Sequence, residues 1–68
     1  GIIDAYIEEE DGLVVVDYKT DRIYHSHLLV EQYKTQLDYY RRALAQMTGK
    51  PVKGAVIYSL AMQQEVWV

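Results

Sequence analysis

The 68-residue chain contains no cysteine, so no disulfide can stabilise it. At this length a single hydrophobic core is only marginally stable without a disulfide, a metal ion or a partner. No apolar run approaches the length that crosses a membrane, and no signal peptide is visible. We therefore expect one small soluble domain, cytoplasmic and without a membrane partner.

Positive charge is also scarce, with 7 Lys and Arg against 10 Asp and Glu and a net charge of -3. A free-standing nucleic-acid binder needs a basic surface for phosphate contacts, so this balance argues against one. The same argument does not hold for a fragment whose parent supplies that surface. Because the chain begins at Gly1 and ends in the strand-like run 66–68, we expect a piece of a larger protein.

Two absences around Gly49-Lys50 exclude a phosphate-binding loop, since the upstream glycine and the following Ser or Thr are both missing. Apolar residues make up 50% of the chain and charged residues 25%, which is typical of a globular domain and not of a disordered one.

One apolar run, 13–16, ends in the charged segment Asp17-Tyr18-Lys19. Because side chains alternate along a strand, Asp17 and Lys19 are expected on one face and Tyr18 on the other. A carboxylate beside an ammonium at the end of a buried strand conflicts with core formation, and such conflicts often mark functional sites. Taken alone, the pair is far more typical of a solvated strand edge than of a functional site.

The first eight residues alternate like a strand, and Asp11-Gly12 is a strong hairpin signal. A two-residue turn there places Asp4 opposite Lys19, whereas a loop over 9–12 places it opposite Asp17. Both registers predict Asp4, Asp17 and Lys19 on one face, but a three-residue loop would separate Asp4 from the pair. The other face is expected to be apolar and suited to packing, with Ile3, Ala5, Ile7, Val14, Val16 and Tyr18.

Apolar residues recur in steps of three and four from about Leu28 to Met47, which predicts an amphipathic helix that Gly49 and Pro51 end. Its inward stripe is expected to contain Leu29, Tyr33, Leu37, Tyr40, Leu44 and Met47. Since Gln36 lies four residues before Tyr40, we expect both to face the sheet. Periodicity alone favours the simpler interpretation, a tyrosine at the edge of the core beside an incidental glutamine.

The segments on either side of this helix complete the expected fold. Residues 20–27 predict a loop, and its two histidines, His25 and His27, lack a third metal ligand and are expected to be exposed. Residues 52–60 predict a second buried strand, parallel to 13–19 through a right-handed crossover, and 65–68 begin another.

Three segments follow one another in the chain: Gly1-Ile2-Ile3-Asp4, Asp17-Tyr18-Lys19-Thr20 and Gln36-Leu37-Asp38-Tyr39-Tyr40. Together they resemble the ordered motifs of RecB-type nucleases, a branch of the PD-(D/E)XK superfamily. The nearest resemblance is to the C-terminal nuclease domain of AddA-type helicase-nuclease subunits, especially over 16–21 and 33–37. It covers nearly the whole chain, and three loose motifs in the right order form a fairly specific signal.

The resemblance implies roles for individual residues. In that family the first aspartate and the aspartate of Asp-x-Lys bind a divalent cation. The resemblance gives this role to Asp4 and Asp17 here. The backbone carbonyl of Tyr18 would add a ligand, and Mg²⁺, with Mn²⁺ as a substitute, is the expected ion. Lys19 matches the lysine that orients or activates water and stabilises the charge that develops on the phosphorane.

Two residues of the expected helix complete the motif set. Gln36 and Tyr40 match the glutamine and the tyrosine with which the family shapes the site and holds DNA. The resemblance also implies the fold class α/β (α+β). We expect a partial restriction-endonuclease-like core of order β-β-α-β-β, with a mixed sheet and a helix on one face. The domain expected is 1–68, a fragment of a single nuclease domain whose upstream helix, first strand and histidine are missing.

The function implied is a metal-dependent DNA exonuclease within a helicase-nuclease that acts in double-strand break repair and recombination. Expected partners are DNA, the helicase portion of the parent chain and a second helicase-nuclease subunit. Exposed strand edges also allow self-association. The alternative is a nuclease-like module that has lost catalysis and serves a structural or DNA-guiding role.

Overall fold

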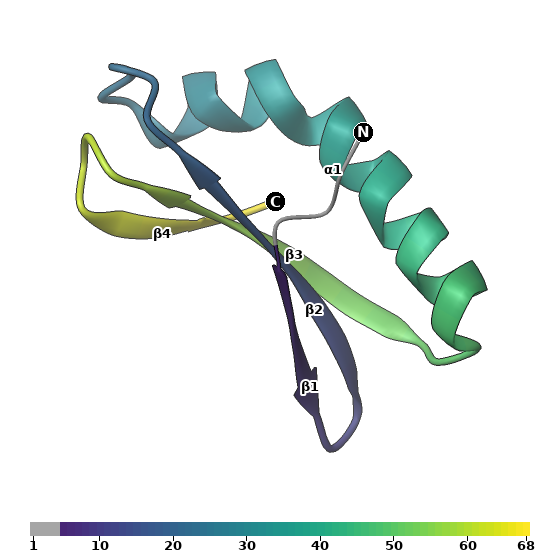
Figure 1. The fold of residues 1–68 in the computed structure, drawn as a ribbon. Coiled ribbons are helices and arrows are strands. Elements are labelled where there is room, and N and C mark those ends of the chain that lie inside the picture. Colours follow the sequence, from purple (N-terminus) through teal and green to yellow (C-terminus); the bar gives the residue numbers. More distant parts are fainter. Residues whose placement is uncertain (1–4) are drawn as a thin grey trace.

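A four-stranded sheet and a single helix make up residues 5–68, the part of the chain that the computed structural model describes (Figure 1). The elements in chain order are β1 (Ala5–Glu9), β2 (Gly12–Lys19), α1 (Ser26–Thr48), β3 (Val52–Ser59) and β4 (Gln64–Trp67). The strands lie in the sheet in the order β1-β2-β3-β4. This arrangement confirms the expected β-β-α-β-β order and the α+β class.

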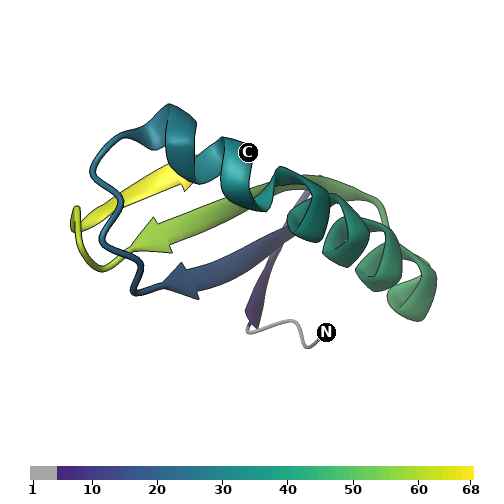
Figure 2. The same ribbon diagram turned by 90° about the horizontal axis from the view of Figure 1, so that it is seen from above.

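The two central strands, β2 and β3, are parallel, whereas the outer pairs β1–β2 and β3–β4 are antiparallel. The parallel pairing predicted from the strand–helix–strand pattern is therefore confirmed. A helix is needed to bring the chain back to the start of a parallel neighbour, and α1 does so above the sheet (Figure 2).

The β1–β2 hairpin turns through Glu10 and Asp11, with Glu9 paired to Gly12 and Glu8 to Leu13. The loop is even, and the register is that predicted for a loop over 9–12. Gly12 has φ 152°, and a Cβ there would lie 3.0 Å from the Pro51 carbonyl oxygen, so the close approach of these two backbones requires glycine.

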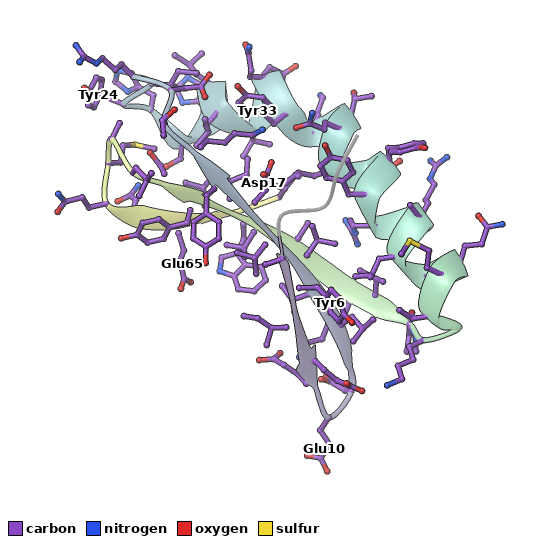
Figure 3. The ribbon with its side chains drawn as sticks, viewed as in Figure 1. Tyr6, Glu10, Asp17, Tyr24, Tyr33 and Glu65 are labelled. Atoms are coloured by element: carbon purple, nitrogen blue, oxygen red, sulfur yellow. The ribbon has the colours of Figure 1, made fainter. Side chains whose placement is uncertain are left out.

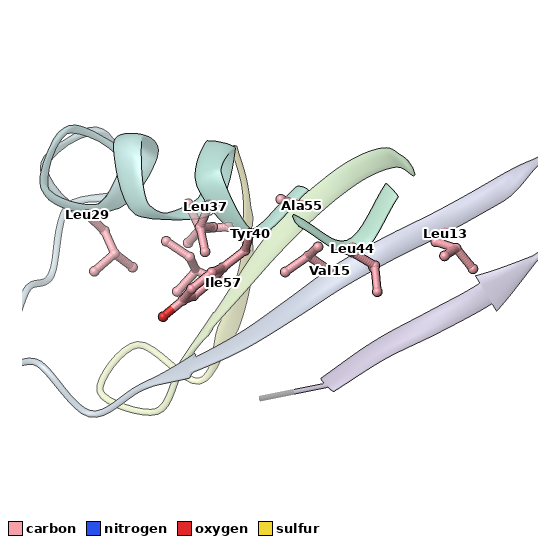
Figure 4. Close-up of a cluster of buried hydrophobic side chains, with 9 residues drawn as sticks. Leu13, Val15, Leu29, Leu37, Tyr40, Leu44, Ala55 and Ile57 are labelled. Atoms are coloured by element: carbon pink, nitrogen blue, oxygen red, sulfur yellow. The ribbon is translucent and has the colours of Figure 1, made fainter. Parts of the chain in front are cut away.

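α1 begins two residues earlier than predicted, with His25 as its N-cap, and ends at a left-handed Gly49, whose N–H donates to the Ala45 carbonyl. Its apolar stripe packs on β2 and β3, and Figure 4 shows this core in close-up. The buried cluster consists of Leu13, Val15, Leu29, Leu37, Tyr40, Leu44, Ala55, Ile57 and Val66. No helix within residues 5–68 is long and apolar enough to cross a bilayer.

The face that the helix covers differs from the one expected. α1 packs on the face of Leu13 and Val15, which by strand alternation is also the face of Asp17. The opposite face carries only a small cluster of Val14, Val16, Val56 and Ala5, while its Ile7 and Tyr18 are 52% and 54% exposed. Both faces of β2 are apolar, so alternation alone could not decide which face the helix would cover.

Two residues that were predicted to face inward from the helix are exposed. Met47 is 76% exposed, because the stripe continues from Leu44 to Thr48, whose hydroxyl donates to the Leu44 carbonyl at 2.7 Å. Gln36 is exposed at the margin of α1, since Leu37 and Tyr40 fill the side that packs on the sheet. The prediction of an inward Met47 was therefore wrong, whereas Gln36 does face the sheet, where its Oε1 accepts from Lys19 Nζ at 3.1 Å, but from an exposed position.

Candidate active site

The site forms where β2 carries Asp17 under the helix. Asp17 is 3% exposed and pairs in register with Ile57, which is fully buried. A buried carboxylate is costly unless a charged or hydrogen-bonding partner compensates for its lost hydration. Lys19 provides such a partner, with its Nζ 3.0 Å from Asp17 Oδ2. The strand therefore supplies both members of an ion pair on one face.

The Lys19 ammonium is contacted from α1 as well. Its Nζ donates to Gln36 Oε1 at 3.1 Å and lies 4.2 Å from the centre of the Tyr33 ring. The Lys19 side chain is only 18% exposed. An aromatic face at this distance attracts a cation through its quadrupole, so the ammonium has favourable partners on both β2 and α1.

Tyr33 is in turn held by the chain that leaves β2. Its hydroxyl donates to Asp21 Oδ2 at 2.6 Å. This hydrogen bond is the main reason that the pKa of Tyr33 rises to about 12, and burial and the negative charges of Asp21 and Asp17 raise it further. Tyr33 is therefore a neutral phenol at physiological pH. In Figure 3, Asp17 and Tyr33 lie on the side of the sheet that α1 covers, and Glu65 lies on the other.

The structure brings together some of the residues predicted for the site. Asp17, Lys19 and Gln36 form one connected cluster. Tyr40 is 6% exposed and belongs to the apolar core beneath α1. The side chain of Tyr18 points to the opposite face, where its ring lies 6.2 Å from that of Tyr58. Asp4 lies outside the described residues.

Sequence reasoning missed the contribution of Asp21 and assigned Tyr33 to the core stripe alone. Two signals could have found them. Tyr33 precedes Gln36 by one helical turn and so shares its face, and Asp21 follows Lys19 by two residues, the spacing of side chains on one side of a strand.

The two histidines are exposed, as predicted, with ring centres 5.9 Å apart. No group of three or more His, Cys, Asp or Glu side chains within 5–68 is arranged to hold a metal ion. At the end of β2, the described chain offers the Asp17 carboxylate and main-chain carbonyl oxygens. These are hard oxygen donors, the type that Mg²⁺ prefers, and waters commonly complete its shell. The donor set therefore fits a hard divalent cation, although one side-chain carboxylate does not complete a site.

A sequence model of the PD-(D/E)XK nuclease superfamily matches residues 1–66. The chain belongs to the PD-(D/E)XK nuclease superfamily. The resemblance identified from the three motifs is thus confirmed at the level of the superfamily.

Curated relatives agree with this superfamily assignment. The chain is 48% identical over 68 residues to an ATP-dependent helicase/nuclease subunit of Lachnoclostridium phytofermentans, covering 97% of the chain and 5% of the relative. It is 46% identical over 68 residues to the protein of the same name from Clostridium novyi, covering 97% and 6%. It is 50% identical over 60 residues to the protein of the same name from a Thermoanaerobacter species, covering 85% of the chain and 5% of the relative. The chain thus spans only 5–6% of the length of these relatives.

Proposed function

We propose that this chain is the nuclease part of a helicase-nuclease and that it hydrolyses phosphodiester bonds of DNA as a metal-dependent exonuclease. The superfamily and the name shared by the relatives support a nuclease that is part of a helicase-nuclease. We also propose its place in double-strand break repair and recombination. There the helicase portion of the parent chain and a second subunit would act with it on DNA.

One observation carries the proposal. The Lys19 ammonium lies 3.0 Å from the carboxylate of Asp17, which is 3% exposed, and contacts Gln36 on the facing helix at 3.1 Å. Three motif residues from two segments of the chain therefore meet at one point. A solvated strand edge would not require that a charged pair be buried under a helix.

The cation that we propose is Mg²⁺, with Mn²⁺ as a substitute. Asp17 and the backbone carbonyl of Tyr18 would hold it, together with Asp4, which immediately precedes the first described strand. When bound, such an ion lowers the pKa of coordinated water and neutralises charge in an in-line displacement at phosphorus. Asp17 would then exchange its ion pair with Lys19, wholly or in part, for the cation.

Lys19 would act directly on the reacting atoms. Its ammonium has three N–H donors, and one of them can orient the attacking water or bind the phosphoryl oxygen on which negative charge increases. Gln36 Oε1 holds Nζ at the margin of α1. We propose that Gln36, which is exposed, holds DNA on the helix side, and that Tyr40, 6% exposed in the core beneath α1, shapes the site from within.

The decisive test is Asp17→Asn in the full-length parent protein. This substitution keeps the shape of the side chain but removes its charge, so we expect DNA cleavage to be abolished while helicase ATPase activity and the circular dichroism spectrum stay as in wild type. Asp38→Asn is the matched control, because Asp38 is exposed and pairs with Arg42 on the outside of α1. Cleavage by the Asp17→Asn protein at the wild-type rate would refute the proposal.

A metal-binding measurement separates an active nuclease from a module that only guides DNA. We expect Mg²⁺ to bind the wild-type parent in calorimetry and to alter its affinity for DNA, with both effects lost in Asp17→Asn. DNA affinity that is the same with and without Mg²⁺ would favour the guiding module.

A further inference from the structure

The Lys19 ammonium rests on a tyrosine ring that is itself fixed by a carboxylate. Nζ lies 4.2 Å from the centre of the Tyr33 ring, and the Tyr33 hydroxyl donates to Asp21 Oδ2 at 2.6 Å. We propose that Tyr33 and Asp21 are positioning residues for Lys19, and that their hydrogen bond fixes the ring against which the ammonium is held for phosphodiester hydrolysis. The inference rests on the proposed function of Lys19.

A lysine needs such support. Its ammonium is a point charge at the end of a flexible four-carbon stem with several rotatable bonds. Asp17 and Gln36 provide oxygen partners at 3.0 and 3.1 Å, but both are residues that the proposed function engages with cation or DNA. The Tyr33 ring attracts the ammonium without competing for either of these roles. It therefore keeps a favourable partner in place when the oxygen contacts rearrange during a reaction cycle.

Asp21 determines where the ring lies. It follows β2 by two residues, in the connection to α1, whereas Tyr33 lies on the third turn of the helix. Their hydrogen bond, 2.6 Å long, therefore joins the end of the catalytic strand to the helix above it. Such short bonds to an ionised acceptor are stronger than neutral ones. The same bond is the main reason that the pKa of Tyr33 is raised to about 12, so the phenol keeps the proton that it donates to Asp21.

Tyr33 also connects the ammonium to the core beneath the helix. Its side chain is partly buried and packs against the core cluster of α1, β2 and β3. A ring anchored by the core on one side and by Asp21 at its hydroxyl has little freedom to turn. Nζ is consequently held relative to Asp17 by rigid elements.

The test uses the full-length parent protein with a DNA substrate at saturating Mg²⁺. Tyr33→Leu removes the ring, and we expect kcat to fall roughly 10- to 100-fold, as for small misplacements of a catalytic group, with an unchanged KM for DNA and unchanged ATPase activity. Tyr33→Phe keeps the ring and loses only the hydrogen bond, so its loss should be smaller. Asp21→Ala should resemble Tyr33→Phe, and Asp21→Asn, which retains an acceptor oxygen, should restore most of the rate.

Matched controls come from the outer surface of the same helix. Tyr39→Leu and Asp38→Ala alter exposed residues of the same types, and both should leave kcat and KM as in wild type. A merely structural Tyr33 would change the melting temperature and the fraction of folded protein, but not kcat per folded molecule. For this reason each rate is divided by the fraction of folded protein.

The outcomes distinguish the two proposals. Suppose that the wild type is active and Asp17→Asn is not. If Tyr33→Leu and Asp21→Ala then have the same kcat as the wild type, the positioning role is refuted while the proposed function stands. Equal rates for Asp21→Asn and Asp21→Ala, both below wild type, would also contradict the hydrogen-bond argument. If Tyr33→Leu does not fold, Tyr33→Phe and Asp21→Ala decide the question. A wild-type parent that does not cleave DNA, or an Asp17→Asn protein that does, refutes the proposed function itself.

Discussion

At the scale of single residues, the site depends on a charged pair placed where the strand would otherwise carry core side chains. Asp17 occupies the position after Leu13 and Val15 on the helix-covered face, so its carboxylate replaces an apolar side chain in the buried row. Its partner Lys19 lies two residues further, where the strand ends. Burial makes this pair sensitive to the loss of either member, because the remaining charge would lack compensation.

The ionisation of Tyr33 gives a pH-dependent prediction at this scale. Its pKa is about 12 in the folded chain, against an ordinary value of 10.0. Between these pH values the unfolded chain has released the phenolic proton while the folded chain keeps it. The free energy of unfolding must therefore fall as pH rises through this window. The stabilisation that comes from the raised pKa of Tyr33 is fully present below pH 10.

The measurement is urea unfolding of this chain and of its Tyr33→Phe variant at several alkaline pH values. Other tyrosines and lysines titrate equally in both proteins, so their effects cancel in the difference. We expect the free energy of unfolding of the wild type to fall relative to that of Tyr33→Phe between pH 10 and pH 12. A difference that is constant over this range would show that the Asp21 hydrogen bond does not perturb Tyr33.

At the scale of elements, the end of α1 is fixed by the backbone conformation of one residue. Gly49 has φ 69° and ψ 13°, and its N–H donates to the Ala45 carbonyl. A Cβ at this position would meet nothing within 4 Å, so the only obstacle to a side chain is the left-handed backbone itself.

Replacing Gly49 therefore has a cost that comes from backbone strain alone. We expect Gly49→Ala to lower the free energy of unfolding by roughly 1–2 kcal/mol and Gly49→Asn by less, since asparagine tolerates this conformation better. Gln46→Ala, at an exposed site inside the helix, is the control and should be neutral or slightly stabilising. Urea unfolding measures all three. Equal stability of wild type and Gly49→Ala would mean that the helix end relaxes to a right-handed conformation.

At the scale of the whole molecule, a single layer of side chains between α1 and the sheet supplies most of the core. Leu37 is fully buried and lies in this layer with Val15 and Ile57. The opposite face of the sheet carries a smaller cluster and exposed aromatic residues such as Trp67, which is 59% exposed. The stability of residues 5–68 thus depends on few core contacts.

Truncation within that layer should have a large effect. Leu37→Ala is expected to cost roughly 2–5 kcal/mol, through lost burial and the cavity that remains. This is comparable with the roughly 3–5 kcal/mol that one core supplies in a domain of this size, so most of the variant should be unfolded at 25 °C. Circular dichroism and amide hydrogen exchange would detect the change.

The matched control for this truncation is Leu60→Ala, which removes the same atoms from a side chain that is 49% exposed. We expect it to remain folded, with a small change in the urea midpoint. Similar losses in the two variants would show that burial in the α1–sheet layer is not what stabilises the fold.

Local sequence patterns were enough to predict the elements and their order. The apolar run of β2, the steps of three and four in α1 and the helix-ending Gly49 are local properties, and each predicted its element to within about two residues. Alternation also placed Asp17 and Lys19 on one side of β2, where the structure pairs them. The three motifs sufficed for the superfamily.

Which face of the sheet the helix covers depends on tertiary packing, because both faces of β2 are apolar. That choice buried Asp17. The side of α1 that packs on the sheet, which contains Leu37 and Tyr40, left Met47 exposed and placed Gln36 at the margin, where it meets Lys19. It also joined Asp21 to Tyr33, residues 12 positions apart whose contact depends on the path of the chain after β2. Local periodicity fixes which residues share a face of one element, whereas contacts between elements depend on how those faces pack.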